Sequence, residues 1–347
     1  MAKDETDAWG NSFGVELGKN FEREIREQPE VWERLARTDA ALRLARAIAG
    51  DVLLVGSGSS LFAAQVGALA LRRRGIDAHA VAATEAQNDN NAYHDRVVIA
   101  VSQSGHSADL LSALDALHPR TLIALTNTVA SPLGERADVT IDVAAGVESA
   151  IPASKSVTST IAILLWAASL IAGDEKRNAH ALRGVAQAIR AWLNDSGVDA
   201  VVEAAKSIAQ RPAIVVLGTD YGAPIAREVA LKFKEATYLH AEGFAAGEFR
   251  HGSSAIVDAH SAVIGIMDRD AIEVVGRPLR EAAASGALRY AIGTTTIDGV
   301  PRLGPLLADP YNALAWLVTA QLLALHVARV LGVDSDVPRG LRKAMTE

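Results

Sequence analysis

The chain has 347 residues, half of them hydrophobic, which suffices for the cores of two domains or of one duplicated domain. The formal net charge of -7 excludes the strongly basic surface of a typical nucleic-acid-binding protein, so we expect no nucleic-acid partner. The lack of cysteine excludes disulfides, thiolate nucleophiles and zinc–thiolate sites.

A helical segment is predicted at the start of the chain. Residues 13–49 fit one or two helices, and residues 22–27 carry both signs of charge, as a solvated helix face does. Pro29 interrupts this pattern. We therefore assign residues 1–48 to an N-terminal helical segment, which lacks the basic recognition helix of a DNA-binding protein.

From residue 52 onward, short apolar runs alternate with helical stretches. This alternation predicts a parallel sheet that is covered by helices on both faces. We assign residues 49–195 to this first unit. Its predicted strands are 52–55, 78–82, 97–101, 122–125 and 139–143, and its predicted helices include 61–74, 107–117 and 154–172.

The same alternation recurs in residues 196–347. The strand, loop and helix at 52–74 correspond to those at 213–238, so we predict a duplicated unit. The expected fold class is α/β, with two tandem subdomains that each contain a doubly wound, flavodoxin-like parallel sheet. From residue 186 onward, helices are predicted at 186–193, 198–209, 224–238 and 313–331, and strands at 213–217, 261–267 and 288–292.

Two long apolar stretches are predicted to be buried helices rather than membrane spans. Residues 161–172 are too short to cross a bilayer, and polar residues interrupt the stretch 313–331. The acidic first residues also lack the apolar region of a secretory signal. We therefore expect a cytoplasmic protein that has no membrane partner.

Hydroxyl-rich loops follow two strands of the first unit, at the end of the sheet where ligands of open parallel sheets bind. Gly56, Gly58 and Gly105 let the backbone approach an anion, and the helices that follow present free N–H groups. A single serine-rich loop more often caps a helix, but two such loops on neighbouring strands favour a phosphate site. The candidate donors are Ser59, Ser60, Ser102, Gln103, Ser104 and Ser107.

Other phosphate motifs are absent from the sequence. Residues 56–61 lack the third glycine of a dinucleotide-binding loop, and the chain contains no Gly-Lys-Ser/Thr sequence. The corresponding loops of the second unit, 218–222 and 267–270, carry acidic residues that repel phosphate. We therefore expect one phosphate site per chain.

Charged residues of opposite sign gather on one predicted helix. Glu228, Lys232 and Glu235 fall on one face of it, and His251 follows on a glycine-bounded loop. Solvated helix faces often show the same charge pattern. In an enzyme, however, a carboxylate can move a proton between adjacent carbons of a sugar, and a histidine can open the sugar ring near neutral pH. Such chemistry requires no metal and no organic cofactor.

Together these motifs resemble the sugar isomerase (SIS) family. The resemblance covers residues 21–347 and rests on residues 102–109 and on the longer signature 225–252. Within the family, the chain is similar to the isomerase half of glucosamine-6-phosphate synthase and to stand-alone glucosamine-6-phosphate deaminase-like proteins. The resemblance implies a phosphorylated sugar as substrate and a homodimer.

The resemblance also implies a role for each candidate residue. Glu235 would be the base that moves a proton between C1 and C2. His251 would open the sugar ring from the neighbouring subunit, and Glu228 would orient it. Lys232 would contact the substrate, and Lys343 would contact the sugar or form a Schiff base with a ketose. The phosphate would be held by Ser60, Ser102, Gln103, Ser104 and Ser107, with further substrate contacts at Gly58, Ser59, Ile151 and Ala153.

The sequence departs from the family pattern in four respects. It shows neither the glutaminase domain of the synthase nor a cysteine, so we expect no transfer of ammonia from glutamine by that route. His106 stands where the family has a glutamate, and Ala153 where the synthase has a serine. Residues 253–254 are serines where the synthase has Pro-Leu. The last three differences are expected to remodel the sugar pocket.

The leading functional hypothesis is an amino-sugar-phosphate isomerase/deaminase that is independent of glutamine. It would convert glucosamine 6-phosphate, or a close relative, to fructose 6-phosphate and ammonia. A fructosamine-6-phosphate deglycase and a plain aldose–ketose phosphosugar isomerase use the same proton transfer and stay open as alternatives. A sugar-phosphate sensor without catalysis is the alternative of another class.

Overall fold

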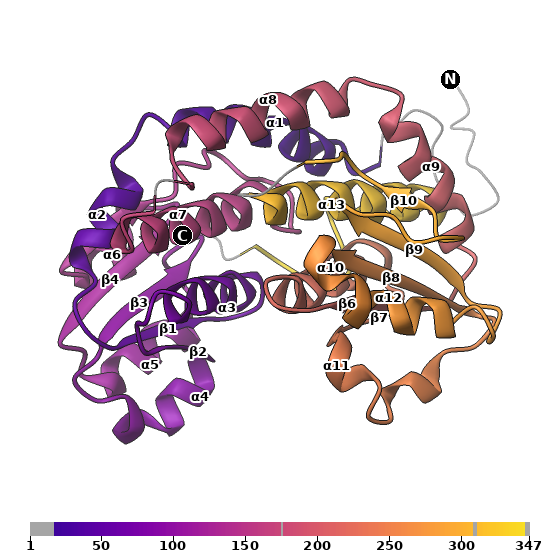
Figure 1. Ribbon diagram of the computed structural model, residues 1–347. Coiled ribbons are helices and arrows are strands. Elements are labelled where there is room, and N and C mark those ends of the chain that lie inside the picture. The colour runs from indigo at the N-terminus through magenta and orange to yellow at the C-terminus, as the bar shows by residue number, and fades with distance from the viewer. Residues whose placement is uncertain (1–16, 175, 308–310, 344–347) are drawn as a thin grey trace.

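The computed structural model of the protein describes residues 17–174, 176–307 and 311–343. Two parallel five-stranded sheets lie side by side, each with helices on both faces (Figure 1). The predicted α/β fold with two tandem subdomains is confirmed, whereas the boundaries proposed at residues 48 and 195 stay predictions. Both sheets have the strand order 2-1-3-4-5 within their own half, which is a doubly wound order.

The first sheet has the order β2-β1-β3-β4-β5, and all neighbouring strands are parallel. Its strands are β1 (Val52–Gly56), β2 (Ala78–Ala82), β3 (Val97–Ser102), β4 (Thr121–Thr126) and β5 (Val139–Asp142). The central strands β1 and β3 are buried along their whole length, which explains their uninterrupted apolar sequences.

The second sheet has the order β7-β6-β8-β9-β10. Its strands are β6 (Ala213–Gly218), β7 (His240–Ala245), β8 (Ser261–Met267), β9 (Leu288–Gly293) and β10 (Arg302–Leu303). The edge strand β7 was not predicted, because its sequence has neither strict alternation nor a continuous apolar run. Its Gly243 is required for close packing, since a Cβ there would lie 2.4 Å from the Ala226 carbonyl oxygen.

Helices fill the space around the sheets. They are α1 (Lys19–Leu35), α2 (Ala40–Ala47), α3 (Ser59–Arg72), α4 (Ala83–Asn88), η1 (Asn90–Tyr93), α5 (Ala108–Leu117), α6 (Pro132–Arg136), α7 (Lys155–Ile171), α8 (Ala179–Leu193), α9 (Gly197–Ile208), α10 (Gly222–Thr237), α11 (Ala246–Phe249), η2 (Ser253–Ile256), η3 (Arg269–Ala271), α12 (Ile272–Glu281) and α13 (Asn312–Val330). One large core joins both halves and contains side chains of α1, α3, α7, α10 and α13. Smaller cores lie under α4 and α5 and under α11 and α12.

Pro29 does not break the first helix, contrary to the interruption expected from the sequence. Helix α1 runs through this proline, which is buried. A proline lacks the N–H that would bond to the carbonyl four residues earlier, here that of Ile25. The Gln28 side chain supplies a replacement, because its Nε2 donates to the Ile25 carbonyl oxygen at 3.2 Å. The chain turns instead between α1 and α2.

Helix α13 forms part of the shared core, as predicted. Within the described residues it is the one helix long and apolar enough to cross a membrane, yet 83% of its apolar window is buried inside the fold. It packs against α9 and α10 of its own half and against α1 and α7. Its apolar composition is thus explained by packing on several sides.

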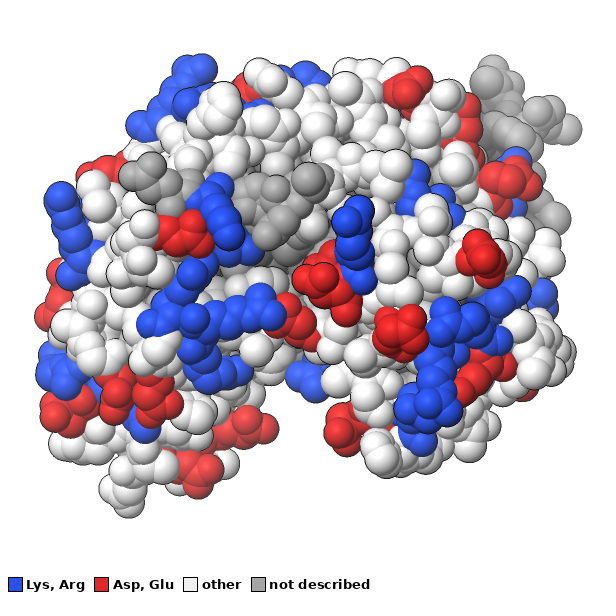
Figure 2. All heavy atoms as spheres, viewed as in Figure 1, with Lys and Arg blue, Asp and Glu red and all other residues white. Residues whose placement is uncertain are grey.

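Charges of both signs are mixed over the face of the molecule shown in Figure 2. Groups of adjoining blue side chains lie on both halves of this face, and red side chains lie beside them. A notch separates the two halves at its lower edge. The absence of a nucleic-acid partner stays a prediction that this mixed pattern supports.

Candidate active site

The candidate site lies where α3 of the first half packs against α10 of the second half (Figure 1). Helix α3 begins directly after Gly58, whose φ of 55° is easily adopted by glycine. The turn places Ser59 between two charged side chains of α10. The Ser59 hydroxyl donates to Glu228 Oε1 at 3.1 Å and accepts from Lys232 Nζ at 3.2 Å. A serine of one half is thereby joined to the charged face of the other.

Lys232 lies between the two carboxylates of α10. Its Nζ is 2.5 Å from Glu235 Oε2 and 3.4 Å from Glu228 Oε1. The side chains of Lys232 and Glu228 are 1% exposed, and that of Glu235 is 18% exposed. The shared face predicted from the spacing is confirmed, and it is buried rather than solvated. Glu235 is therefore the member of this cluster that a ligand can reach most easily.

Burial changes how the cluster ionises. Burial raises the pKa of Glu228 to about 7, and the charge of Glu235 acts in the same direction. The charge of Lys232 and the hydrogen bond from Ser59 lower this pKa but do not outweigh burial. Burial alone would lower the pKa of Lys232, but the charges of Glu228 and Glu235 raise it above its ordinary value. Near neutral pH the ammonium of Lys232 therefore stays charged, while Glu228 is close to half protonated.

Glu228→Gln is expected to weaken the dependence of the unfolding free energy on pH. The folded wild type holds the Glu228 proton up to a pKa of about 7, above the ordinary value of 4.5 that applies to the unfolded chain. Raising the pH through this window therefore destabilises the wild type, by on the order of 3 kcal/mol for the whole shift. Urea unfolding of both proteins across this pH range measures the difference. Equal pH dependence in the two proteins would show that Glu228 titrates normally.

A small cavity of about 30 Å³ lies at the carboxyl ends of the first sheet's strands. At about 10–15 Å³ for each water molecule, it has room for about two waters. Four residues predicted from the sequence line it: Ser59, Ser60, Gln103 and Ala153. Sequence reasoning missed three hydroxyl-bearing residues that also line it, Thr126, Ser156 and Thr160.

The loop after β3 is held by its own hydrogen bonds. Ser102 Oγ accepts from the Gly105 N–H at 3.1 Å, and Ser104 Oγ accepts from a backbone N–H two residues later at 3.2 Å. Gly105 has a φ of 68°, and a Cβ there would lie 2.0 Å from a neighbouring hydroxyl oxygen. Ser107 precedes α5 but does not cap it through its side chain. Ser102, Ser104 and Ser107 do not line the small cavity, so their contact with phosphate stays a prediction.

The C-terminal segment brings Lys343 onto the loop between β5 and α7. Its Nζ donates to the Ala150 carbonyl oxygen at 2.7 Å and lies 3.7 Å from Glu148 Oε2. Burial lowers the pKa of Lys343, the carboxylates of Glu148 and Glu24 oppose this, and the charge of Lys232 lowers it further. Lys343 is thus a partly buried amine within electrostatic range of the α10 cluster.

The buried carboxylate of Glu148 holds the conformation of this loop by hydrogen bonds. It accepts hydrogen bonds from the backbone and the hydroxyl of both Ser154 and Ser156, the shortest at 2.6 Å. Burial would raise the pKa of Glu148, but the charge of Lys343 and these hydrogen bonds lower it. The predicted substrate contacts Ile151 and Ala153 lie on the same loop, so Glu148 fixes the backbone that carries them.

The solvated face predicted for residues 22–27 is wrong at Glu24. This side chain is fully buried, and its carboxylate accepts from the backbone N–H groups of Ser149 and Ala150. Burial raises the pKa of Glu24. The carboxylate of α1 therefore serves as a second anchor of the loop, because it satisfies N–H groups that would otherwise be buried without a partner.

His251 lies after α11 in an exposed part of the chain. Residues 250–260 are mostly exposed, and η2 within them contains no buried residue. Among the described residues, the His251 side chain forms no hydrogen bond or ion pair with the α10 cluster. Figure 1 shows α11 at the lower edge of the molecule, away from the contact between α3 and α10. One chain thus does not bring His251 to Glu228, and the expected contact across a dimer stays a prediction.

Comparison with known proteins identifies a family that covers both sheets. Residues 47–170 and 207–302 match the family model of the SIS domain. A glutamine–fructose-6-phosphate aminotransferase (isomerizing) from Aeropyrum pernix is 35% identical over 354 aligned positions, which cover 93% of this chain and 56% of that protein. The chain therefore spans about half the length of this curated relative.

Two solved structures have the same fold at lower identity. The C-terminal domain of glucosamine-fructose-6-phosphate aminotransferase from Francisella tularensis superposes with a TM-score of 0.82 at 23% identity, covering 92% of this chain and 98% of that one. A glucosamine-6-phosphate deaminase from Thermotoga maritima superposes with a TM-score of 0.77 at 22% identity, covering 93% and 98%. With the family match over both sheets, these findings show that the chain belongs to the SIS domain family.

Proposed function

We propose that the protein is a phosphosugar isomerase/deaminase that converts glucosamine 6-phosphate, or a close relative, to fructose 6-phosphate and ammonia. The observation that carries this proposal is the placement of Glu235. Its partly exposed carboxylate is held at 2.5 Å by a buried ammonium, that of Lys232, which is itself fixed by Ser59 and Glu228. A positioned carboxylate of this kind suits proton transfer between adjacent carbons.

The reaction follows from one proton shuttle. In the open-chain sugar, Glu235 removes the C2 proton to form an enolamine and returns a proton to C1. The product is a ketimine at C2, and water hydrolyses it to the ketose and ammonia. Lys232 and Lys343 place positive charge where negative charge develops on the sugar oxygen during the transfer.

The phosphate is proposed to bind at the small cavity of the first half. Ser59, Ser60 and Gln103 provide donors there, and the start of α3 adds backbone N–H groups. Because the cavity holds only about two waters, we expect the loops around it to adjust when the phosphate enters. A phosphorylated substrate also fits the cytoplasmic location predicted from the sequence.

A homodimer is proposed to complete the site with the partner subunit's His251. The exposed segment 250–260 supports this, because an unburied stretch of that length can be covered by a second copy. In the part of the chain that the structure describes, Glu228 Oε2 is a buried oxygen without a hydrogen-bond partner, so it can accept from an imidazole N–H once the helices adjust. The proposal makes each active site depend on two chains.

Mixing two inactive variants is expected to restore activity. In a dimer of His251→Ala and Glu235→Gln chains, one of the two composite sites has both wild-type residues. After subunit exchange, the mixture is expected to recover about a quarter of wild-type activity, because half of the dimers are mixed. A mixture as inactive as its two components would show that each site is built from one chain.

The function itself is tested by incubating the protein with glucosamine 6-phosphate and measuring ammonia and fructose 6-phosphate. Equal amounts of the two products are expected. A fructosamine-6-phosphate deglycase would release its amine only from that substrate, and a plain isomerase would interconvert an aldose and a ketose without ammonia. Binding of phosphosugar without turnover of any of these substrates would indicate a sensor.

A further inference from the structure

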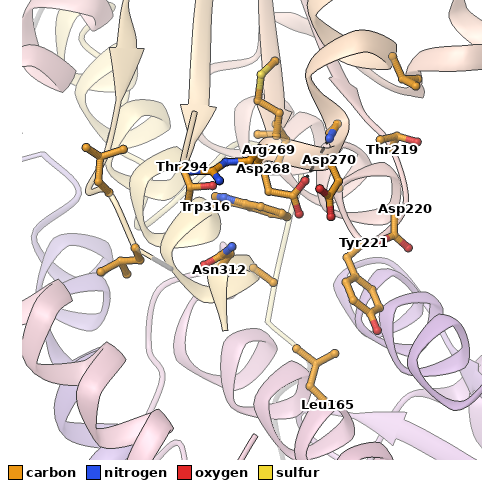
Figure 3. A pocket seen from close by; sticks show the side chains of 18 of the residues that line it. Leu165, Thr219, Asp220, Tyr221, Asp268, Arg269, Asp270, Thr294, Asn312 and Trp316 are labelled. Atoms are coloured by element: carbon orange, nitrogen blue, oxygen red, sulfur yellow. Dashed lines mark hydrogen bonds between the residues drawn. The ribbon is translucent and has the colours of Figure 1, made fainter. Parts of the chain in front are cut away.

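A second and larger cavity lies at the carboxyl ends of β6, β8 and β9 (Figure 3). Its volume of about 860 Å³ is within the range of small-molecule sites. The loops after these strands and the beginning of α13 form its walls. None of Ser59, Glu228, Lys232 and Glu235 lines it, so it is separate from the proposed active site.

The two cavities occupy equivalent places in the duplicated fold. The first is lined by residues that follow β1, β3 and β4, and the second by residues that follow β6, β8 and β9. Ser156 and Thr160 of α7 line the first, and Asn312 and Trp316 of α13 line the second, each pair one helical turn apart. The duplication has therefore kept a cavity at the equivalent place in each half, with different side chains around each.

Carboxylates replace the hydroxyl donors in the second cavity. Figure 3 shows Asp268 and Asp270 next to each other, with Asp220 nearby on the loop after β6. Burial raises the pKa of Asp268, and the charges of Asp270 and Asp220 raise it further. Arg73, Arg177 and Arg269 also line the cavity, and Arg73 forms an ion pair with Asp220. The carboxylates of Asp270 and Asp220 nevertheless make the immediate surroundings of Asp268 unfavourable for a further negative charge and favourable for a cation.

Two buried polar groups at the wall of this cavity have no hydrogen-bond partner within residues 17–174, 176–307 and 311–343. Asn312 is 8% exposed and Trp316 is 5% exposed, and no group in these ranges bonds to Asn312 Oδ1 or Trp316 Nε1. Both side chains lie at the cavity wall in Figure 3. An unsatisfied buried polar atom is costly, so a ligand that bonds to it gains affinity. Oδ1 accepts and Nε1 donates, and a sugar hydroxyl can do both.

We propose that this cavity is a second ligand site, for an amino sugar that carries no phosphate. Its ammonium would lie near Asp268 and Asp270, and its hydroxyls would bond to Asn312 Oδ1 and Trp316 Nε1. A metal ion is the less suitable cation, since no three acidic or imidazole side chains are grouped to hold one in the part of the chain that the structure describes. The site does not depend on the reaction proposed for Glu235.

Titration calorimetry with glucosamine tests the proposal on the whole chain, with fructose 6-phosphate present to occupy the first site. Binding to wild type is expected, with affinity lowered at least about tenfold by Asp268→Asn and by Asn312→Ala, since each removes a bond to a charged or buried group. Asp298→Asn, an exposed change outside the cavity, serves as control and is expected to bind like wild type. Glucose, which lacks the ammonium, is expected to bind at least about tenfold more weakly.

Three results would overturn the second site. They are no binding of glucosamine by wild type, equal affinity of wild type and Asp268→Asn, and equal affinity for glucose and glucosamine. Loss of binding when fructose 6-phosphate is added would also count against it, because glucosamine would then occupy the first site. None of these readouts requires turnover, so failure of the second site and failure of the proposed reaction are distinguishable.

Discussion

Replacing Glu235 by Gln is expected to lower kcat for ammonia release by about 10²–10⁴-fold while the affinity for the phosphosugar changes little. Gln keeps the side-chain shape and can still accept a hydrogen bond from Lys232, which lies 2.5 Å from the carboxylate. It cannot accept the C2 proton. The loss should therefore appear in kcat rather than in KM, as expected for a group that acts in the transition state.

The matched control is Glu203→Gln on the exposed side of α9, a change of the same chemistry far from the site. This variant should keep wild-type kinetics. An unchanged kcat in Glu235→Gln would assign the proton transfer to another group. An equal loss in both variants would point to a general effect on the preparation.

Lys232→Met is expected to destabilise the fold by about 3–5 kcal/mol, the largest effect on stability that we predict. Lys232 is 1% exposed and lies between Glu228 and Glu235. Its removal leaves two carboxylates on one buried helix face without their counter-charge, and also removes the donor to Ser59. Urea unfolding at pH 7.5, compared with wild type, measures the loss.

Lys234→Met provides the control for this substitution, because Lys234 lies on the same helix and is exposed. It should change stability by less than about 0.5 kcal/mol. In Lys232→Met, lowering the pH or adding Glu228→Gln should restore part of the loss, since either change removes a buried negative charge. No recovery by either route would show that the loss comes from packing of the lysine stem rather than from charge.

Local spacing in the sequence predicted the helices and the charged face of α10. Glu228, Lys232 and Glu235 are neighbours on any helix that spans them, so no tertiary information was needed. Their burial is a tertiary feature: α10 packs against α3, where Ser59, 169 residues from Glu228 in the chain, bonds to that glutamate. The charge pattern of a helix alone does not show whether its charged face is buried by such a contact or exposed to solvent.

Other parts of the site could not be predicted for the same reason. Glu24 belongs to a run of mixed charges, and its partners are backbone N–H groups of residues 149 and 150, which carry no side-chain signal. Ser156 and Thr160 are two of the five hydroxyl-bearing residues of α7, four of which stand at positions 156–160, so the sequence alone does not single them out. Their spacing of one turn is a signal that could have been read once α7 was placed beside the first sheet.

The acidic loops of the second half led to a prediction about phosphate binding, and the structure adds a large cavity beside these loops. On the sequence alone, their charge leads to the expectation of one phosphate site per chain, which stays a prediction. The sequence did not reveal the large cavity between them, because its walls include Leu165 of α7, Arg73 of α3 and Trp316 of α13, which are far apart in the chain. The fold was duplicated and the loops then diverged, which explains why we expect the two halves to bind different ligands.

The most direct test of the proposed chemistry uses glucosamine 6-phosphate that carries deuterium at C2. It measures whether the bond between C2 and the deuterium is broken. We predict that the wild type breaks this bond, so that the label appears at C1 of fructose 6-phosphate or in the solvent, and that Glu235→Gln binds the sugar but leaves the bond intact. An intact bond in sugar bound to the wild type, or equal cleavage by the variant, would contradict a proton shuttle at Glu235.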